Sequence, residues 1–62
     1  SELLPKAIDA LPQKYGEVLK LRNAEDLSYE EIASRLGLSV GTVKSRLSRA
    51  REYLREELEK LK

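Results

Sequence analysis

The sequence contains no cysteine and no histidine among its 62 residues. Without thiols there is no disulfide framework, and without thiolate or imidazole ligands the usual zinc sites are excluded. The commonest general base is missing as well. The adjacent pair Glu30 and Glu31 does not replace it, because neighbouring residues of a helix do not face each other. We therefore expect neither an enzyme nor a protein that needs a metal or another cofactor.

Long apolar runs are also missing. No stretch approaches the roughly 18 apolar residues of a membrane span, and the N-terminus lacks a basic stretch followed by an apolar signal segment. These absences predict a cytoplasmic protein without membrane contact. A chain this short has room for one domain, spanning 1–62, and buries only about 60% of its unfolded surface. Because no disulfide or metal is available, helix packing must supply the whole core.

The net charge of +1 hides an uneven distribution. Positions 1–27, 28–39 and 52–62 each sum to −1. Positions 40–51 carry four bases and no acid: Lys44, Arg46, Arg49 and Arg51. A basic segment of this kind on a helix is most often a solvated face, and the alternative is binding to a polyanion such as DNA.

The first half of the chain predicts two short helices. Apolar residues recur at helical spacing between positions 3 and 11, which indicates a helix near residues 2–10. Pro12 suits the first position of a second helix, whose amphipathic pattern fades by Asp26. Gly16 disfavours this second helix, because glycine costs about 1 kcal/mol relative to alanine inside a helix.

A third helix has a clear start and a clear end. Ser28 and Glu31 form the pattern of a capping box, with Ser28 as N-cap. Leu27 and Ile32 are spaced as a hydrophobic staple across that start. Gly37 can adopt the left-handed conformation that ends a helix. The third helix is therefore expected between Ser28 and Gly37.

A fourth helix begins at once and has no breaker before the C-terminus. Ser39 is its expected N-cap, and Leu38 can staple to Val43. One apolar stripe continues through Val43, Leu47, Ala50, Leu54, Leu58 and Leu61. The helix could run about 22 residues, or roughly 33 Å. Two helices joined by a short turn with glycine predict a helix-turn-helix over about 28–50, within an all-α, four-helix domain that has a long C-terminal recognition helix.

The start of this fourth helix differs from that of the third. Thr42 stands at the position that Glu31 occupies in the third helix. Without an acid there, the positive end of the helix dipole is free for a phosphate.

Three segments together resemble region 4 of bacterial sigma factors: Leu-Pro at 11–12, LSYEEIA at 27–33 and GTVKSRLSRAR at 41–51. The likeness is greatest to the extracytoplasmic-function group and covers about residues 10–60. It implies sequence-specific binding of double-stranded DNA at the promoter −35 element in transcription initiation. It also implies contacts with the flap of the RNA polymerase core and with an anti-sigma factor.

Two positions and one whole segment depart from the family pattern. Asp26 stands where glycine is common, and Gly16 stands where a larger, often basic residue is usual. The Gly16 departure puts a surface contact of the second helix in doubt. Nothing in the chain resembles region 2, so the chain alone is not expected to act as a complete sigma factor.

The fourth helix supplies most of the expected site. At 100° per residue from Val43, the residues on or beside the face opposite the core are expected to contact bases, and they match the positions where the family reads DNA. They are Lys44, Ser45, Ser48 and Arg49. The expected phosphate contacts are Tyr29, Arg35, Thr42, Arg46 and Arg51. Arg46 and Arg51 lie nearer the core flank, where an ion pair within the protein is the alternative. Gly41 either allows close approach of the backbone to DNA or is merely tolerated in the first turn.

Two other functions remain open from the sequence. One is the output domain of a LuxR-type response regulator, which shares a four-helix plan and a Gly-Thr-Val turn, although the continuation at 45–51 argues against it. The other is a module that binds the polymerase or an anti-sigma factor without binding DNA. We expect a monomer, because the apolar stripe can be used fully inside the domain and a strict heptad would place Glu57 in the seam.

Overall fold

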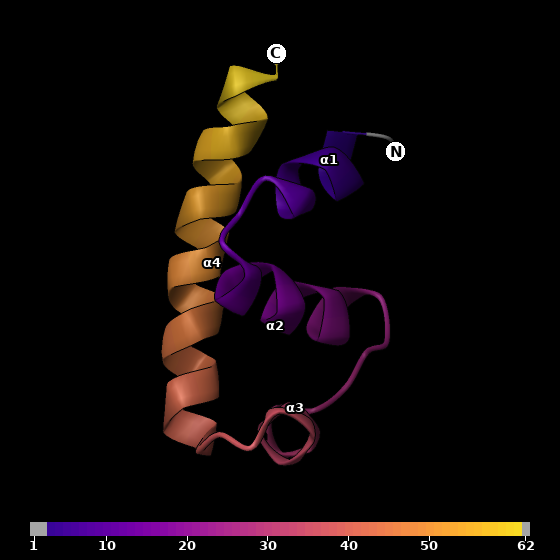
Figure 1. Cartoon of the computed structure of the whole chain (residues 1–62), viewed down its shortest axis with the longest axis vertical. Helices are drawn as coiled ribbons and strands as arrows, with labels where there is room; N and C mark the ends of the chain where they lie inside the picture. Colours follow the sequence, from indigo (N-terminus) through magenta and orange to yellow (C-terminus); the bar gives the residue numbers. More distant parts are fainter. Residues whose placement is uncertain (1–2, 62) are drawn as a thin grey trace.

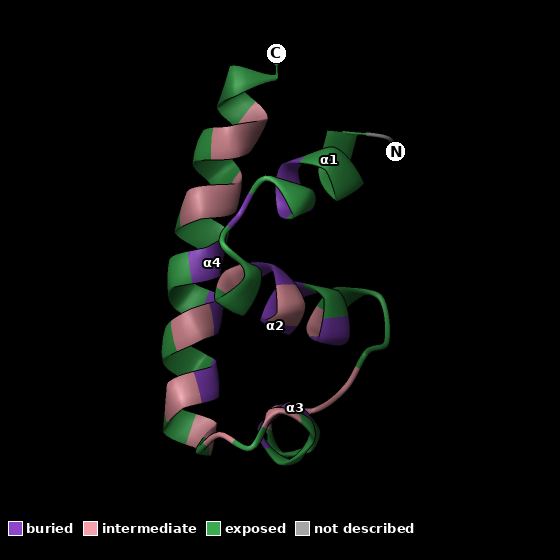
Figure 2. Ribbon diagram, viewed as in Figure 1, coloured by how far each residue is buried: buried purple, intermediate pink, exposed green. Residues whose placement is uncertain are grey.

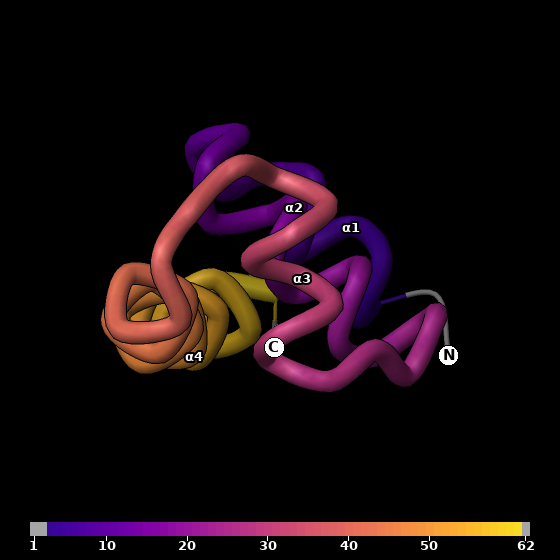
Figure 3. Tube along the Cα trace, turned by 90° about the horizontal axis from the view of Figure 1, so that it is seen from below, coloured from indigo at the N-terminus to yellow at the C-terminus, as the bar shows by residue number. Residues whose placement is uncertain are grey.

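The computed structural model describes residues 3–61, which form four helices. Their bounds are α1 (Leu3–Asp9), α2 (Gln13–Asn23), α3 (Tyr29–Leu36) and α4 (Val40–Lys60). In Figure 1, α4 stands upright along one side of the molecule, α1 and α2 are stacked beside it, and α3 lies below α2 near the start of α4. Figure 3 looks up from below and shows α4 almost end-on, with α3 lying beside it. The predicted all-α, four-helix architecture is confirmed.

The element bounds differ from the predicted ones only at the ends. Position 2 of the first predicted helix lies outside the described residues. Pro12 is the N-cap of α2, with φ −52° and ψ 146°, and is not its first helical residue. Its carbonyl accepts hydrogen bonds from the amides of Tyr15 and Gly16. Helix α4 ends at Lys60, one residue short of the prediction.

Gly16 lets α1 and α2 approach closely. It is buried, and a Cβ at this position would lie 3.3 Å from the carbonyl oxygen of Ile8. A side chain would therefore push the two helices apart by a few tenths of an ångström. The intrinsic cost of glycine inside α2 is offset by this close packing, which helix propensity alone does not indicate.

The connection from α2 to α3 is held by backbone and side-chain contacts. Asp26 adopts a left-handed conformation with φ 54°, which aspartate tolerates because its short polar side chain can bond locally. The Leu27 amide donates to the carbonyl of Leu21 at 3.2 Å. The Arg22 guanidinium donates to the Leu27 carbonyl at 2.8 Å and lies 5.3 Å from the centre of the Tyr29 ring. The chain therefore enters α3 in a fixed position.

The turn of the helix-turn-helix has the predicted pattern. Gly37 has φ 70°, in the left-handed region, and its amide donates to the carbonyl of Ala33. The amide of Leu38 donates to the same carbonyl at 2.9 Å, as in a Schellman-type end. Leu27 and Leu38 are both half-buried against the core, as expected of residues that staple the starts of α3 and α4.

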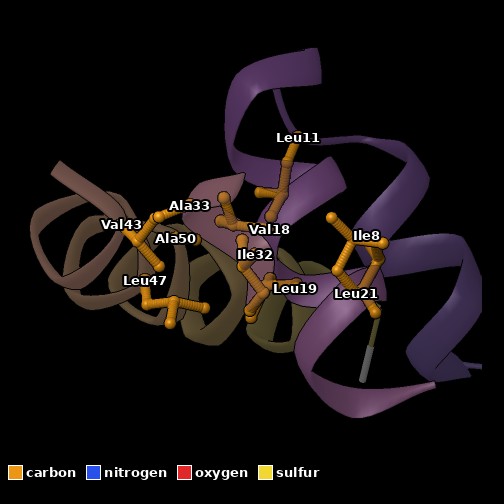
Figure 4. Packing of buried hydrophobic residues seen from close by; sticks show 10 residues of the cluster. All are labelled: Ile8, Leu11, Val18, Leu19, Leu21, Ile32, Ala33, Val43, Leu47 and Ala50. Carbon is orange, nitrogen blue, oxygen red and sulfur yellow. The ribbon is translucent and has the colours of Figure 1, made fainter. Parts of the chain in front are cut away.

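All four helices, or the segments that join them, contribute to one core. Its buried side chains, shown in Figure 4, are Ile8, Leu11, Val18, Leu19, Leu21, Ile32, Ala33, Val43, Leu47 and Ala50. In Figure 2 the buried residues of α4 are turned toward the other helices. Burial of these apolar side chains is the main favourable term in folding.

The apolar stripe of α4 is not fully used, so that expectation is wrong at its distal end. Leu54 and Leu58 are only half-buried, and Leu61 is 40% exposed. Helix α1 packs on α4 but has only seven residues. It is therefore too short to cover the last turns of a 21-residue helix.

Candidate nucleic-acid interface

The N-terminus of α4 is capped but carries no acid. The Ser39 hydroxyl oxygen accepts a hydrogen bond from the Thr42 amide at 3.1 Å, and the same hydroxyl donates to Thr42 Oγ1 at 2.9 Å. Within the described residues, the amides of Val40 and Gly41 have no hydrogen-bond partner. These amides and the positive end of the helix dipole are available to an anion.

The outward face of α4 carries the predicted base-reading residues. Val43, Leu47 and Ala50 are buried, which fixes the inner face of the helix. All four expected base contacts are exposed on the remaining surface: Lys44, Ser45, Ser48 and Arg49. The structure therefore brings this set together on the accessible side of one helix. Figure 2 shows that much of the surface of α4 is exposed.

The four cations in the first half of α4, up to Arg51, fall into two groups. Lys44, Arg49 and Arg51 are exposed and have no hydrogen bond or ion pair with any of residues 3–61. Arg46 is half-buried, and its guanidinium lies 3.9 Å from a carboxylate oxygen of Glu17 in α2. Arg46 thus lies on the core flank with an internal partner, whereas Arg51 is turned further toward solvent than we expected.

The other expected phosphate contacts already have partners inside the protein. Arg35 lies 3.5 Å from a carboxylate oxygen of Glu25, and both side chains are more than half exposed. Such an exposed ion pair contributes at most about 1 kcal/mol, so a phosphate could replace Glu25. The ring of Tyr29 lies against the Arg22 guanidinium, and Thr42 is engaged with the N-cap. These side chains are held in place before any ligand arrives.

Arg22 is the functional side chain that the sequence reasoning missed. It is half-buried and connects the carbonyl of Leu27 with the ring of Tyr29. No sequence signal marks it, since the hydrogen bond spans five residues across a loop and not one helical turn. It positions the start of α3, where one of the expected phosphate contacts lies.

Gly41 has open space around it. A Cβ at this position would meet only the Ser39 hydroxyl, at 3.9 Å. Packing within the protein therefore gives no reason for a glycine here, in contrast to Gly16. This observation favours the interpretation that Gly41 allows the backbone to approach a ligand closely.

Other kinds of site are not formed by residues 3–61. No group of acids there could hold a metal ion, and no helix there is both long and apolar enough to cross a membrane. Of the adjacent pair Glu30 and Glu31, Glu31 has a structural role in the cap of α3. Hydrogen bonds from the backbone and the side chain of Ser28 lower the pKa of Glu31, so its carboxylate is an ionised cap.

Comparison with known proteins decides the family. A model of the family described as Sigma-70, region 4 matches residues 1–54. The chain belongs to this family. Region 4 domains bind DNA and are not enzymes, and the match leaves the response-regulator alternative without support.

The relatives of this region 4 chain include sigma factors of the extracytoplasmic-function group. It is 46% identical over 57 residues to the ECF RNA polymerase sigma factor SigE of Mycolicibacterium smegmatis, covering 92% of this chain and 22% of that protein. It is 53% identical over 57 residues to the RNA polymerase sigma-E factor of Streptomyces antibioticus, covering 92% of this chain and 32% of that protein. It is 43% identical over 61 residues to the ECF RNA polymerase sigma factor SigW of Bacillus subtilis, covering 98% of this chain and 33% of that protein. The predicted resemblance is confirmed, and the chain spans a third or less of the length of these relatives.

Proposed function

We propose that this region 4 chain binds double-stranded promoter DNA at the −35 element, as part of an RNA polymerase sigma factor in transcription initiation. The observation that carries the proposal is a set of three exposed cations without internal partners, Lys44, Arg49 and Arg51. They follow the first turn of α4, which contains no acid. A helix is about 10–12 Å wide with its side chains, and the major groove of B-DNA is about 12 Å wide. The N-terminal half of α4 therefore fits into the groove with its cations toward the DNA.

Within this docking the four outward residues of α4 read bases. Lys44 and Arg49 suit the O6 and N7 acceptors of guanine, which are the commonest targets of such side chains. The hydroxyls of Ser45 and Ser48 can donate to or accept from either kind of base edge. We assign phosphate contacts to Tyr29, Arg35, Thr42, Arg46 and Arg51. Such contacts fix the position of the protein without reading sequence.

The affinity of the isolated chain for DNA should be modest and strongly dependent on salt. About four to six cationic contacts would release a similar number of counterions, and each contact steepens the fall of affinity with salt. Specific binding of full strength would then require the rest of a sigma factor on polymerase, since the chain is only a part of its relatives.

Protein partners are expected at the other end of the molecule. Leu3, Leu4 and Leu61 are exposed, and Figure 1 shows the start of α1 and the end of α4 at the end remote from the start of α4. Exposed apolar side chains favour a protein contact, and the flap of the polymerase core and an anti-sigma factor are the partners we propose. The setting would be cytoplasmic. The isolated chain is proposed to be a monomer, on the remaining argument that a strict heptad would place Glu57 in the seam of a coiled coil. A stable two-fold dimer in sedimentation would contradict this.

The decisive experiment selects bound duplexes from a random DNA pool at low salt. We expect one enriched sequence, bound with an affinity that falls steeply between low and moderate salt. If no sequence is enriched and no duplex is bound, the proposed function is wrong. The remaining alternative would then be a module that binds polymerase or an anti-sigma factor without DNA.

A further inference from the structure

Helix α4 changes the sign of its charge half-way along one continuous helix. From Val40 to Arg51 it carries four bases and no acid. From Glu52 to Lys60 it carries four acids and two bases. The change begins on the outward face, because Glu52 is exposed one helical turn beyond Ser48.

The carboxylate of Glu52 is exposed to solvent and has no partner among the described residues. No hydrogen bond or ion pair with any of residues 3–61 involves its carboxylate. By contrast, the carboxylate of Glu57 is bound by Lys60 at 2.9 Å. A cap or a structural ion pair therefore does not explain Glu52.

The length of α4 determines whether the carboxylate of Glu52 meets DNA. Its 21 residues extend about 31 Å, far more than the width of a major groove. If the helix enters the groove with its first half, the second half can point away from the duplex. If the helix instead lies lengthwise on the DNA surface, Glu52 comes against phosphates at a cost that does not depend on base sequence.

We propose that Glu52 is a specificity determinant that acts by repulsion, disfavouring lengthwise, non-specific docking of α4 on DNA. The inference rests on the proposed function, since it presupposes that the first half of α4 reads DNA. Non-specific binding is driven by phosphate neutralisation and samples many orientations, whereas the specific complex uses one. A single outward carboxylate therefore weakens non-specific binding more than it weakens the specific complex. This difference disfavours binding at wrong sites.

The test compares Glu52→Gln with Asp9→Asn in the full chain. Both substitutions remove one negative charge while nearly keeping the side-chain shape. Asp9 is in α1, away from the outward face of α4, and is paired with Lys20 at 3.1 Å between two exposed side chains. Affinities would be measured at low and moderate salt for the duplex selected by the wild-type chain and for a scrambled duplex, with circular dichroism to confirm the fold.

We expect Glu52→Gln to tighten binding to the scrambled duplex about threefold at low salt, the size of a screened single-charge effect. Binding to the selected duplex should change less, so that the ratio of the two affinities falls. Asp9→Asn should leave that ratio unchanged. An unchanged ratio in Glu52→Gln would overturn the inference, and so would a loss confined to the selected duplex, which would make Glu52 an acceptor for a base. A wild-type chain without any preferred duplex would instead overturn the proposed function, and the inference with it.

Discussion

Helices α3 and α4 begin with the same cap and differ in the residue three positions after it. In each, a serine hydroxyl accepts a hydrogen bond of 3.1 Å from the amide of that residue. In α3 the residue is Glu31, whose carboxylate accepts a hydrogen bond in return from the Ser28 amide at 2.8 Å. In α4 it is Thr42, and the first turn has no acid. Helix α3 neutralises its own positive end, and α4 leaves that end open to an external anion.

The basic side chains of the two helices show the same contrast. Arg35 in α3 is paired with Glu25, whereas Lys44 and Arg49 in α4 have no partner among the described residues. The arginine of α3 is thus paired inside the protein, whereas two cations of α4 are presented to solvent without a partner among residues 3–61. This difference, more than the shared helical geometry, supports the proposal that α4 and not α3 reads DNA.

The largest expected effect concerns what the two helices share, which is the core. Ile32 of α3 and Leu47 of α4 are fully buried, so Ile32→Ala and Leu47→Ala should each lower the free energy of unfolding by about 2–5 kcal/mol. Urea denaturation followed by circular dichroism measures this. Leu61→Ala is the control, because Leu61 is 40% exposed and should cost far less. An equal loss at Leu61 would show that the core extends to the end of α4.

The next effect separates the reading of base sequence by α4 from its general electrostatic attraction to DNA. Arg49→Ala should cost about 1–3 kcal/mol on the selected duplex and much less on a scrambled one, because a base contact is lost. Arg55→Ala is a matched control, since Arg55 is an exposed arginine on the acidic half of the same helix. Equal losses on both duplexes for Arg49→Ala would show that α4 is not docked as proposed.

A third variant would give α4 the start that α3 has. Thr42→Glu completes a capping box with Ser39, so helix stability should rise by a few tenths of a kcal/mol while affinity for every duplex falls by about 1 kcal/mol. Thr42→Gln can form the same box without the charge and serves as the control. If the Glu and Gln variants bound DNA equally well, the open N-terminus of α4 would have no part in binding.

These contrasts were readable from the sequence to different degrees. The caps at Ser28 and Ser39 and the end at Gly37 predicted α3 and α4 almost to the residue, because capping depends on side chains within one turn. The exposed face of α4 was predictable from its helical period. The caps and the exposed face each depend only on residues close together in the sequence.

Features that depend on neighbouring elements were not readable. The close approach of Gly16 to Ile8 and the pairing of Arg35 with Glu25 join residues from different elements. The exposure of Leu61 depends on how far α1 reaches along α4. The spacing of residues along a single helix contains none of this information.

A smaller effect belongs to α3. Arg35→Ala should weaken binding to all duplexes by similar factors and reduce the salt slope by about one unit, since only a phosphate contact is lost. Salt titrations on the selected and the scrambled duplex give both quantities. Glu25→Gln frees Arg35 from its internal partner and should act in the opposite direction. A loss restricted to the selected duplex would make Arg35 a reader of sequence, like the residues of α4.

The smallest effect is a pH dependence of stability that arises at the start of α3. Hydrogen bonds from Ser28 lower the pKa of Glu31 below its usual value of 4.5. A carboxyl group with a lowered folded pKa adds stability above its unfolded pKa, and this stability is lost as the pH falls through the folded pKa. Glu31→Gln keeps a side chain able to accept from the Ser28 amide but cannot titrate, so its stability should fall less steeply below pH 4.5 than that of the wild-type chain. Urea denaturation across this acid range measures the difference. Parallel curves for the two chains would mean that the carboxylate charge adds nothing to the start of α3.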